Sequence, residues 1–224
     1  MKKEYRKYKN LEFVLSLPDN FREEEKYPVI IFLHGAGTRG NNISEVAENL
    51  FYKICEKYKK FDFVTAAPQC NADSWFDIFS EVIEFSEYIQ SLDFIDPSRI
   101  YGMGASMGGY GIWQLAMSCP DRFAAIVPIC GGGMYWNAAR LKNIPVWAFH
   151  GDCDAVVDKS ESEKMVTAVN RCGGTAKLTV YPNCGHDAWS ETYGNAEVFE
   201  WLARQSKKGD ITERTKFDNS EIYG

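Results

Sequence analysis

Short apolar runs recur along the chain and are separated by segments with helical spacing. Most of the runs are continuous in apolarity rather than alternating, and polar or glycine-containing turns bound them. This pattern is typical of parallel strands that helices cover on both faces. The predicted strands span residues 11–17, 29–33, 61–67, 99–104, 123–130, 146–149 and 176–181.

Helical patterns lie between these runs. They span residues 43–58, 79–92, 107–118, 159–171 and 195–204. The alternation predicts an α/β fold with a mostly parallel, doubly wound sheet flanked by helices. We expect one domain over residues 1–204. Residues 205–224 are polar and lack apolar periodicity, so we expect a loosely held extension or an arm that contacts a partner. A homodimer is one such partner arrangement that the sequence allows.

Composition narrows the classes of partner. The formal net charge of the 224 residues is −6 and the chain has no basic block, which argues against nucleic acid or an anionic membrane as the main partner. The basic residues 1–9 run into a strand-like segment, so we expect no secretory signal and a cytoplasmic location. A removed signal would instead make the protein secreted. The seven cysteines lack a Cys-x-x-Cys pair and fit reduced thiols.

The segment 99–110 carries the strongest chemical signal. Ser106 has a glycine two positions before it and another two after it, between a strand-like run and a helical pattern. This arrangement predicts a nucleophile elbow, a strained turn that lifts the serine hydroxyl clear of the sheet edge. The N–H of Met107 would then face the negative charge that develops on an attacked carbonyl oxygen.

A reactive serine needs a base, and the chain has three histidines. His34 and His150 end strand-like runs directly before a glycine, so we expect each to brace its loop. His186 lies in the loop after the last predicted strand, beside Gly185, and is the predicted base.

Three aspartates compete for the acid that orients His186. Asp154 is favoured because it lies far enough beyond its strand to reach the final loop. Asp152 is expected to bond N–H groups of its own turn. Asp158 is expected to cap the helix that starts near residue 159.

A glycine-rich loop at 33–40 is the expected source of a second oxyanion donor. The N–H of Ala36 is the first choice and that of Gly37 the alternative, because small residues let the backbone approach the reacting carbonyl. A phosphate cradle is the competing interpretation of such a loop, but the Gly-Lys-Ser/Thr sequence that it requires is missing.

Four segments, at 28–37, 104–110, 150–157 and 185–189, resemble the α/β-hydrolase superfamily. Within it they resemble the compact esterases, a group with feruloyl and acetyl esterases and predicted peptidases. The resemblance implies Ser106 as nucleophile, Asp154 as acid and His186 as base, in the chain order of that superfamily. It also implies backbone donors at Met107 and around Ala36. Asp158 departs from the family, which often has proline there.

The region expected to bind substrate is short and aromatic. Residues 131–143, where larger members of the superfamily carry a lid domain, leave no room for one, so an open cleft is expected. Trp75, Tyr135, Trp136 and Trp189 lie in predicted loops near strand ends. They either pack these loops onto the sheet or wall a pocket for a hydroxycinnamoyl group or a sugar.

Cys153 and Cys184 flank the predicted acid and base. Their spacing matches no usual zinc motif, so we expect no metal and no cofactor, although a disulfide between them is conceivable under oxidising conditions. The sequence thus predicts a serine esterase acting on a small-molecule or oligosaccharide ester. A small peptidase, a dienelactone-type hydrolase and a non-catalytic binding module are the alternatives.

Overall fold

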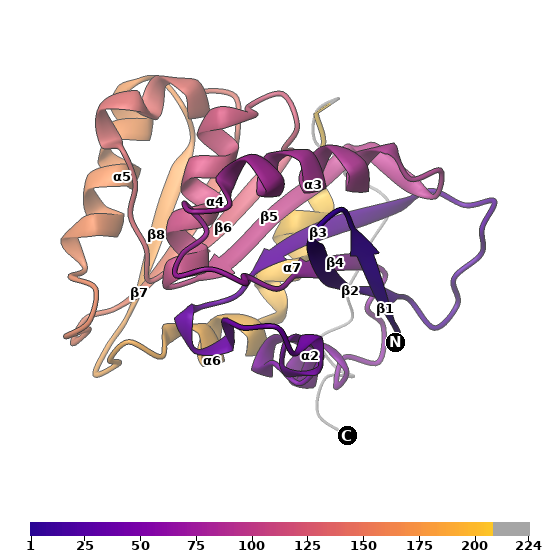
Figure 1. The fold of residues 1–224 in the computed structure, drawn as a ribbon. Helices are drawn as coiled ribbons and strands as arrows, with labels where there is room; N and C mark the ends of the chain where they lie inside the picture. Colours follow the sequence, from indigo (N-terminus) through magenta and orange to yellow (C-terminus); the bar gives the residue numbers. More distant parts are fainter. Residues whose placement is uncertain (208–224) are drawn as a thin grey trace.

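An eight-stranded sheet forms the centre of the computed structural model, which describes residues 1–207 (Figure 1). The strand order is β1-β2-β4-β3-β5-β6-β7-β8. The strands are β1 (Lys2–Tyr8), β2 (Leu11–Leu17), β3 (Tyr27–Leu33), β4 (Val64–Pro68), β5 (Ile95–Ala105), β6 (Ala125–Ile129), β7 (Val146–Gly151) and β8 (Ala176–Tyr181). Strands β3 to β8 are parallel to one another, β2 runs antiparallel to its neighbour β4, and β1 pairs antiparallel with β2. The predicted mostly parallel sheet is confirmed.

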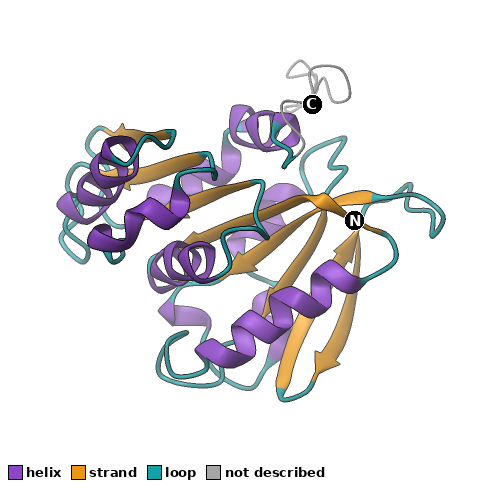
Figure 2. Cartoon of the chain, turned by 90° about the horizontal axis from the view of Figure 1, so that it is seen from above, coloured by secondary structure: helices purple, strands orange, loops and turns teal. Residues whose placement is uncertain are grey.

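Helices cover both faces of this sheet (Figure 2). They are α1 (Ile43–Ala47), α2 (Leu50–Cys55), α3 (Phe79–Ser91), α4 (Met107–Ser118), α5 (Ser160–Arg171), α6 (Ala188–Gly194) and α7 (Ala196–Arg204), with 3-10 turns η1 (Ala36–Thr38) and η2 (Tyr135–Leu141). Helices α3, α4 and α5 pack on one face, and α1, α2, α6 and α7 pack on the other. In β3, Val29 and Ile31 point to the first face while Ile30 and Phe32 point to the second, which explains the continuous apolar run.

Three elements differ from the prediction. Strand β1 is an additional edge strand, which the alternation of charged and aromatic side chains conceals. The helix predicted at 43–58 is broken, because the Asn49 side chain accepts the Phe51 N–H and so begins α2 anew. Helix α6 is also additional; the Asp187 side chain caps it by accepting the Ser190 N–H.

The segment after β6 carries only η2, which packs between α4 and α5 near Trp113 and Met165. No lid domain is inserted there. Of the predicted extension, residues 205–207 lie against β5: the Tyr101 hydroxyl donates to the Gln205 carbonyl at 2.9 Å, and the Lys207 N–H donates to the Ser98 carbonyl at 3.0 Å. Residues 208–224 lie outside the described residues. No described helix has both the length and the apolarity that crossing a membrane requires.

Candidate active site

The turn between β5 and α4 holds Ser106 in a strained conformation, with φ 56° and ψ −119°. The backbone packs so closely on either side of Ser106 that neither Gly104 nor Gly108 could carry a side chain. A Cβ on Gly104 would lie 2.4 Å from the carbonyl oxygen of Gly108, and a Cβ on Gly108 would lie 1.8 Å from that of Leu33. These two glycines therefore let the chain turn sharply enough to present the Ser106 hydroxyl at the carboxyl edge of the sheet.

Three side chains from different strand ends meet at this edge. Ser106 Oγ lies 2.8 Å from His186 Nε2, and His186 Nδ1 lies 2.7 Å from Asp154 Oδ2. A carboxylate oxygen can only accept, so Nδ1 carries the hydrogen and Nε2 presents its lone pair to the hydroxyl. This tautomer is the one that can take a proton from Ser106.

The carboxylate of Asp154 is shielded from solvent; its side chain is 0% exposed. Burial alone would raise the pKa of Asp154, but hydrogen bonds from His186 and from the N–H groups of Val157 and Val156 outweigh it and hold the pKa below its usual value. The group is thus ionised at neutral pH and can stabilise a positive charge on the imidazole of His186.

Asp158 lies at the start of its helix, as predicted, whereas Asp152, predicted to bond N–H groups of its own turn, reaches the loop after β8. Asp152 accepts the N–H of Cys184 at 3.2 Å and so joins the loops after β7 and β8. Asp158 accepts the N–H of Ser160 at 2.8 Å, at the start of α5. Neither side chain is hydrogen-bonded to His186, so Asp154 is the aspartate that the fold brings to the imidazole.

Backbone donors flank the hydroxyl on two sides. Met107 is the first residue of α4, so its N–H has no partner within the helix. Gly35 approaches Ser106 closely, since a Cβ on Gly35 would lie 3.7 Å from the Ser106 Cβ. Ala36 and Gly37 follow in η1 and line the pocket beside Ser106. Both predicted donor sites therefore lie next to the hydroxyl.

Hydrogen bonds of the buried His34 side chain hold the glycine-rich loop at 33–40 in place. Its Nε2 accepts the Cys70 N–H at 3.0 Å, so its Nδ1 carries the hydrogen and donates to the Gly35 carbonyl at 2.7 Å. Burial lowers the pKa of His34 to about 4, which keeps the ring neutral. The bracing role that the sequence suggests for His34 is confirmed.

A pocket of about 420 Å³ opens beside Ser106. Its walls include Trp189, whose ring meets the His186 ring edge-on with centroids 5.1 Å apart. Val156 and Leu50 also line it, and their side chains are 72% and 38% exposed. Sequence reasoning missed these two residues, because a single apolar residue in a loop is a common and weak signal.

Three of the four predicted aromatic residues, Trp75, Tyr135 and Trp136, do not line this pocket. Trp75 is 0% exposed and its Nε1 donates to the His34 carbonyl at 3.0 Å, so its prediction as a substrate contact is wrong. It packs the glycine-rich loop at 33–40 onto the core instead. Trp136 on η2 is 72% exposed, stands edge-on to Tyr135 and does not line the pocket beside Ser106. Of the four predicted aromatic residues the fold thus brings Trp189 to this pocket, where Phe32 and Tyr193 also contribute to the lining.

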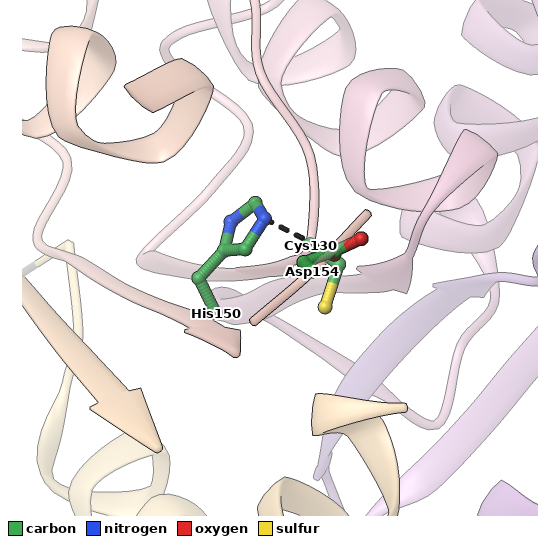
Figure 3. Close-up of side chains that lie close together, drawn as sticks. All are labelled: Cys130, His150 and Asp154. Carbon is green, nitrogen blue, oxygen red and sulfur yellow. Dashed lines mark ion pairs between the residues drawn. The ribbon is translucent and has the colours of Figure 1, made fainter. Parts of the chain in front are cut away.

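A buried cluster of potential metal ligands, Cys130, His150 and Asp154, lies behind the site (Figure 3). Burial raises the pKa of the Cys130 thiol to about 12, and this thiol lies 3.2 Å from the His186 carbonyl, to which it donates. The His150 nitrogen near Asp154 faces the Val157 carbonyl at 2.9 Å and so carries a hydrogen. The three side chains are each hydrogen-bonded to protein groups, so the geometry is that of a hydrogen-bonded network.

The loops that carry the acid and the base are joined at their cysteines. The N–H of Cys153 donates to the Cys184 carbonyl at 2.9 Å, and both side chains are free thiols. The disulfide considered for this pair is therefore not formed in the structure.

The doubly wound sheet, the strained serine turn and the three hydrogen-bonded side chains define an α/β-hydrolase. The chain matches the phospholipase/carboxylesterase family over residues 21–200 and belongs to that family. The resemblance to the compact esterase group is thereby confirmed.

Known proteins agree with this assignment. A thermostable esterase of known structure is 30% identical to this chain, and the two superpose with a TM-score of 0.78. The superposition covers 92% of this chain and 63% of the esterase. The dipeptidyl-peptidase 5 of Porphyromonas gingivalis is 22% identical over 86% of this chain and 35% of its own length. A probable feruloyl esterase C of Aspergillus niger is 22% identical over 86% of this chain and 74% of its own length. The chain therefore spans less than two thirds of the first two relatives.

Proposed function

We propose that the protein is a serine carboxylesterase that hydrolyses short-acyl or hydroxycinnamoyl esters, such as acetyl and feruloyl groups on plant-derived carbohydrate. The observation that carries the proposal is the continuous hydrogen-bonded chain from Ser106 through His186 to Asp154 at the wall of a pocket. The similarity to a probable feruloyl esterase supports the substrate class.

Each residue has a defined part in the proposed reaction. Ser106 Oγ attacks the ester carbonyl carbon while its proton passes to His186 Nε2, and the N–H groups of Met107 and Ala36 bind the oxyanion. The tetrahedral intermediate collapses, and the alcohol leaves with the proton from His186, so that an acyl-enzyme forms. Water then attacks this acyl group, gives a proton to His186, and the acid departs as Ser106 regains its proton. No cofactor enters any step.

The pocket supports a small or flat acyl group. Its volume of about 420 Å³ falls within the range of small-molecule sites. Trp189 offers an aromatic face, and Leu50 and Val156 add apolar surface at the opening. A hydroxycinnamoyl ring can pack on Trp189, whereas a long fatty chain would extend from the pocket into water.

A labelling experiment tests the proposal. A fluorophosphonate probe should modify the wild-type protein and leave Ser106→Ala unmodified, and Ser106→Ala should hydrolyse none of a panel of acetyl, feruloyl and long-chain esters. Full turnover by Ser106→Ala would reject the mechanism. Equal turnover of the long-chain esters would reject the substrate class, and a preference for matched amides or lactones would favour the peptidase or dienelactone alternative.

A further inference from the structure

A second histidine lies behind the acid of the site. His150 is the last residue but one of β7, and its side chain is 0% exposed. Its Nε2 lies 3.2 Å from Asp154 Oδ2 (Figure 3). The same oxygen accepts the His186 N–H. The carboxylate of Asp154 therefore lies between two imidazole rings.

Hydrogen bonds fix the orientation of the His150 ring at both nitrogens. Nε2 lies 2.9 Å from the Val157 carbonyl oxygen, and both this oxygen and the nearby carboxylate can only accept, so Nε2 carries a hydrogen. Nδ1 lies 2.8 Å from the Ser162 hydroxyl oxygen, which lies 2.9 Å from the Gly131 carbonyl oxygen, and the single hydroxyl hydrogen serves one of these two contacts at a time. The ring is thus anchored to α5 and to the segment after β6.

The same contacts close a small ring of bonds around the acid. Val157, whose carbonyl accepts from His150, donates its own N–H to Asp154 Oδ1 at 2.9 Å, and Val156 donates to the same oxygen at 2.9 Å. Oδ2 then faces the two imidazoles. A rotation of the carboxylate would break several of these contacts at once.

We propose that His150 is a positioning residue for hydrolysis: its Nε2–H holds the turn at Val157 and faces Asp154 Oδ2, so that this oxygen stays aligned with His186 Nδ1. This inference rests on the proposed function, because it assigns His150 a part in the same proton transfer. His150 does not line the pocket, so its effect should fall on kcat rather than on KM.

Two substitutions at one position separate positioning from packing. His150→Phe keeps a planar ring but removes the N–H, whereas His150→Gln places an amide N–H near the position of Nε2. We expect His150→Phe to lower kcat on the order of 100-fold with KM unchanged, as a misaligned catalytic group does, and His150→Gln to recover most of that loss. Thr65→Val serves as the matched control; it removes another buried hydrogen bond, to the Tyr52 hydroxyl at 3.1 Å in the opposite half of the sheet, and should leave kcat unchanged.

Proton NMR supplies a readout that packing alone would not move. The hydrogen between His186 Nδ1 and Asp154 should give a far-downfield signal in the wild type, and this signal should shift or vanish in His150→Phe but not in Thr65→Val. If His150→Phe does not fold, Ser162→Ala, which releases the Nδ1 end of the ring, provides the same test and should shift the signal and lower kcat less severely.

The outcomes distinguish the two proposals. Activity retained in Ser106→Ala would reject the proposed function itself. Loss of activity in Ser106→Ala, combined with wild-type kcat and an unmoved signal in folded His150→Phe or Ser162→Ala, would overturn the positioning role of His150 alone. Equal loss of kcat in His150→Phe and His150→Gln would likewise overturn it, since the N–H would then make no difference.

Discussion

The loop after β7 offers three carboxylates within seven residues, and their hydrogen-bond partners separate their roles. Asp152 and Asp158 accept backbone N–H groups at the surface, whereas the side chain of Asp154 is enclosed and shared between His186 and the turn at Val156 and Val157. A carboxylate that both orients an imidazole and stays ionised has the properties of a triad acid.

Asp154→Asn tests this assignment. The amide cannot carry the charge that stabilises a protonated His186 and favours the wrong tautomer, so kcat should fall on the order of 10³–10⁴-fold while KM changes little. Steady-state kinetics with a short-chain ester measure both constants. Asp158→Asn is the matched control and should keep wild-type kcat, because an amide oxygen can still accept the Ser160 N–H. Comparable losses in the two variants would contradict the choice of acid.

At the level of elements, the junction of β5, α4 and β3 holds the site together. The backbone of α4 approaches the end of β3 so closely that Gly108 has no space for a side chain. The same closeness places Gly35, in the glycine-rich loop at 33–40, beside Ser106. The geometry of the nucleophile and that of the donors are therefore set by a single packing contact between elements.

Gly108→Ala should break that contact. Its Cβ would lie 1.8 Å from the Leu33 carbonyl oxygen, so the helix or the strand must move, at a cost of at least about 2 kcal/mol in the free energy of unfolding. Urea denaturation measures this loss, and esterase activity should disappear with it. Gly194→Ala, where nothing lies within 4 Å of the added Cβ, should be neutral. If Gly108→Ala kept full activity and wild-type stability, the turn at Ser106 would accommodate a Cβ at position 108, and the prediction would be wrong.

The start of β5 provides a stability test away from the site. Burial would raise the pKa of Asp96, but bonds from Ser98 and Arg99 outweigh it and lower the pKa below the ordinary value of 3.8. The ionised form is therefore bound more strongly in the folded state, and its contribution is present above pH 3.8 and is lost as the pH falls through the lowered folded-state pKa. Asp96→Asn should thus cost about 1–2 kcal/mol at pH 7 and less at strongly acidic pH. Urea titrations of both proteins at each pH test this, and a pH-independent difference would contradict it.

For the whole molecule, the sequence predicts the interior better than the edges. Strands such as β3 are buried on both faces, so their composition alone marks them. Strand β1 is an edge strand whose exposed charged residues hide the strand period, and α6 is too short to show helical spacing. Both depend on contacts with segments distant in the sequence.

Some features of the site could also be predicted from the sequence, and others could not. Ser106, Asp154 and His186 were predictable because parallel strands bring their carboxyl ends to one edge. The direction in which a loop side chain points could not be predicted. Trp75 is buried in the core, and Trp136 is exposed and does not line the pocket. The contact of His150 with Asp154 was equally hidden, since its bonds to Ser162 and Val157 arise only when α5 packs beside β7.

The way the whole molecule exposes its site predicts its response to aggregated substrate. Only η2 lies where a lid domain would be inserted, and Val156 at the pocket is 72% exposed. Substrate can therefore enter without a lid first moving aside at the surface of aggregated substrate. The initial rate on a partly soluble short-chain ester should therefore saturate below the solubility limit and show no jump above it. Initial rates measured across that limit, with a lidded lipase as a positive control, make the test. A sharp rise in rate at the onset of aggregation would mean that part of the chain covers the pocket and moves aside at an interface.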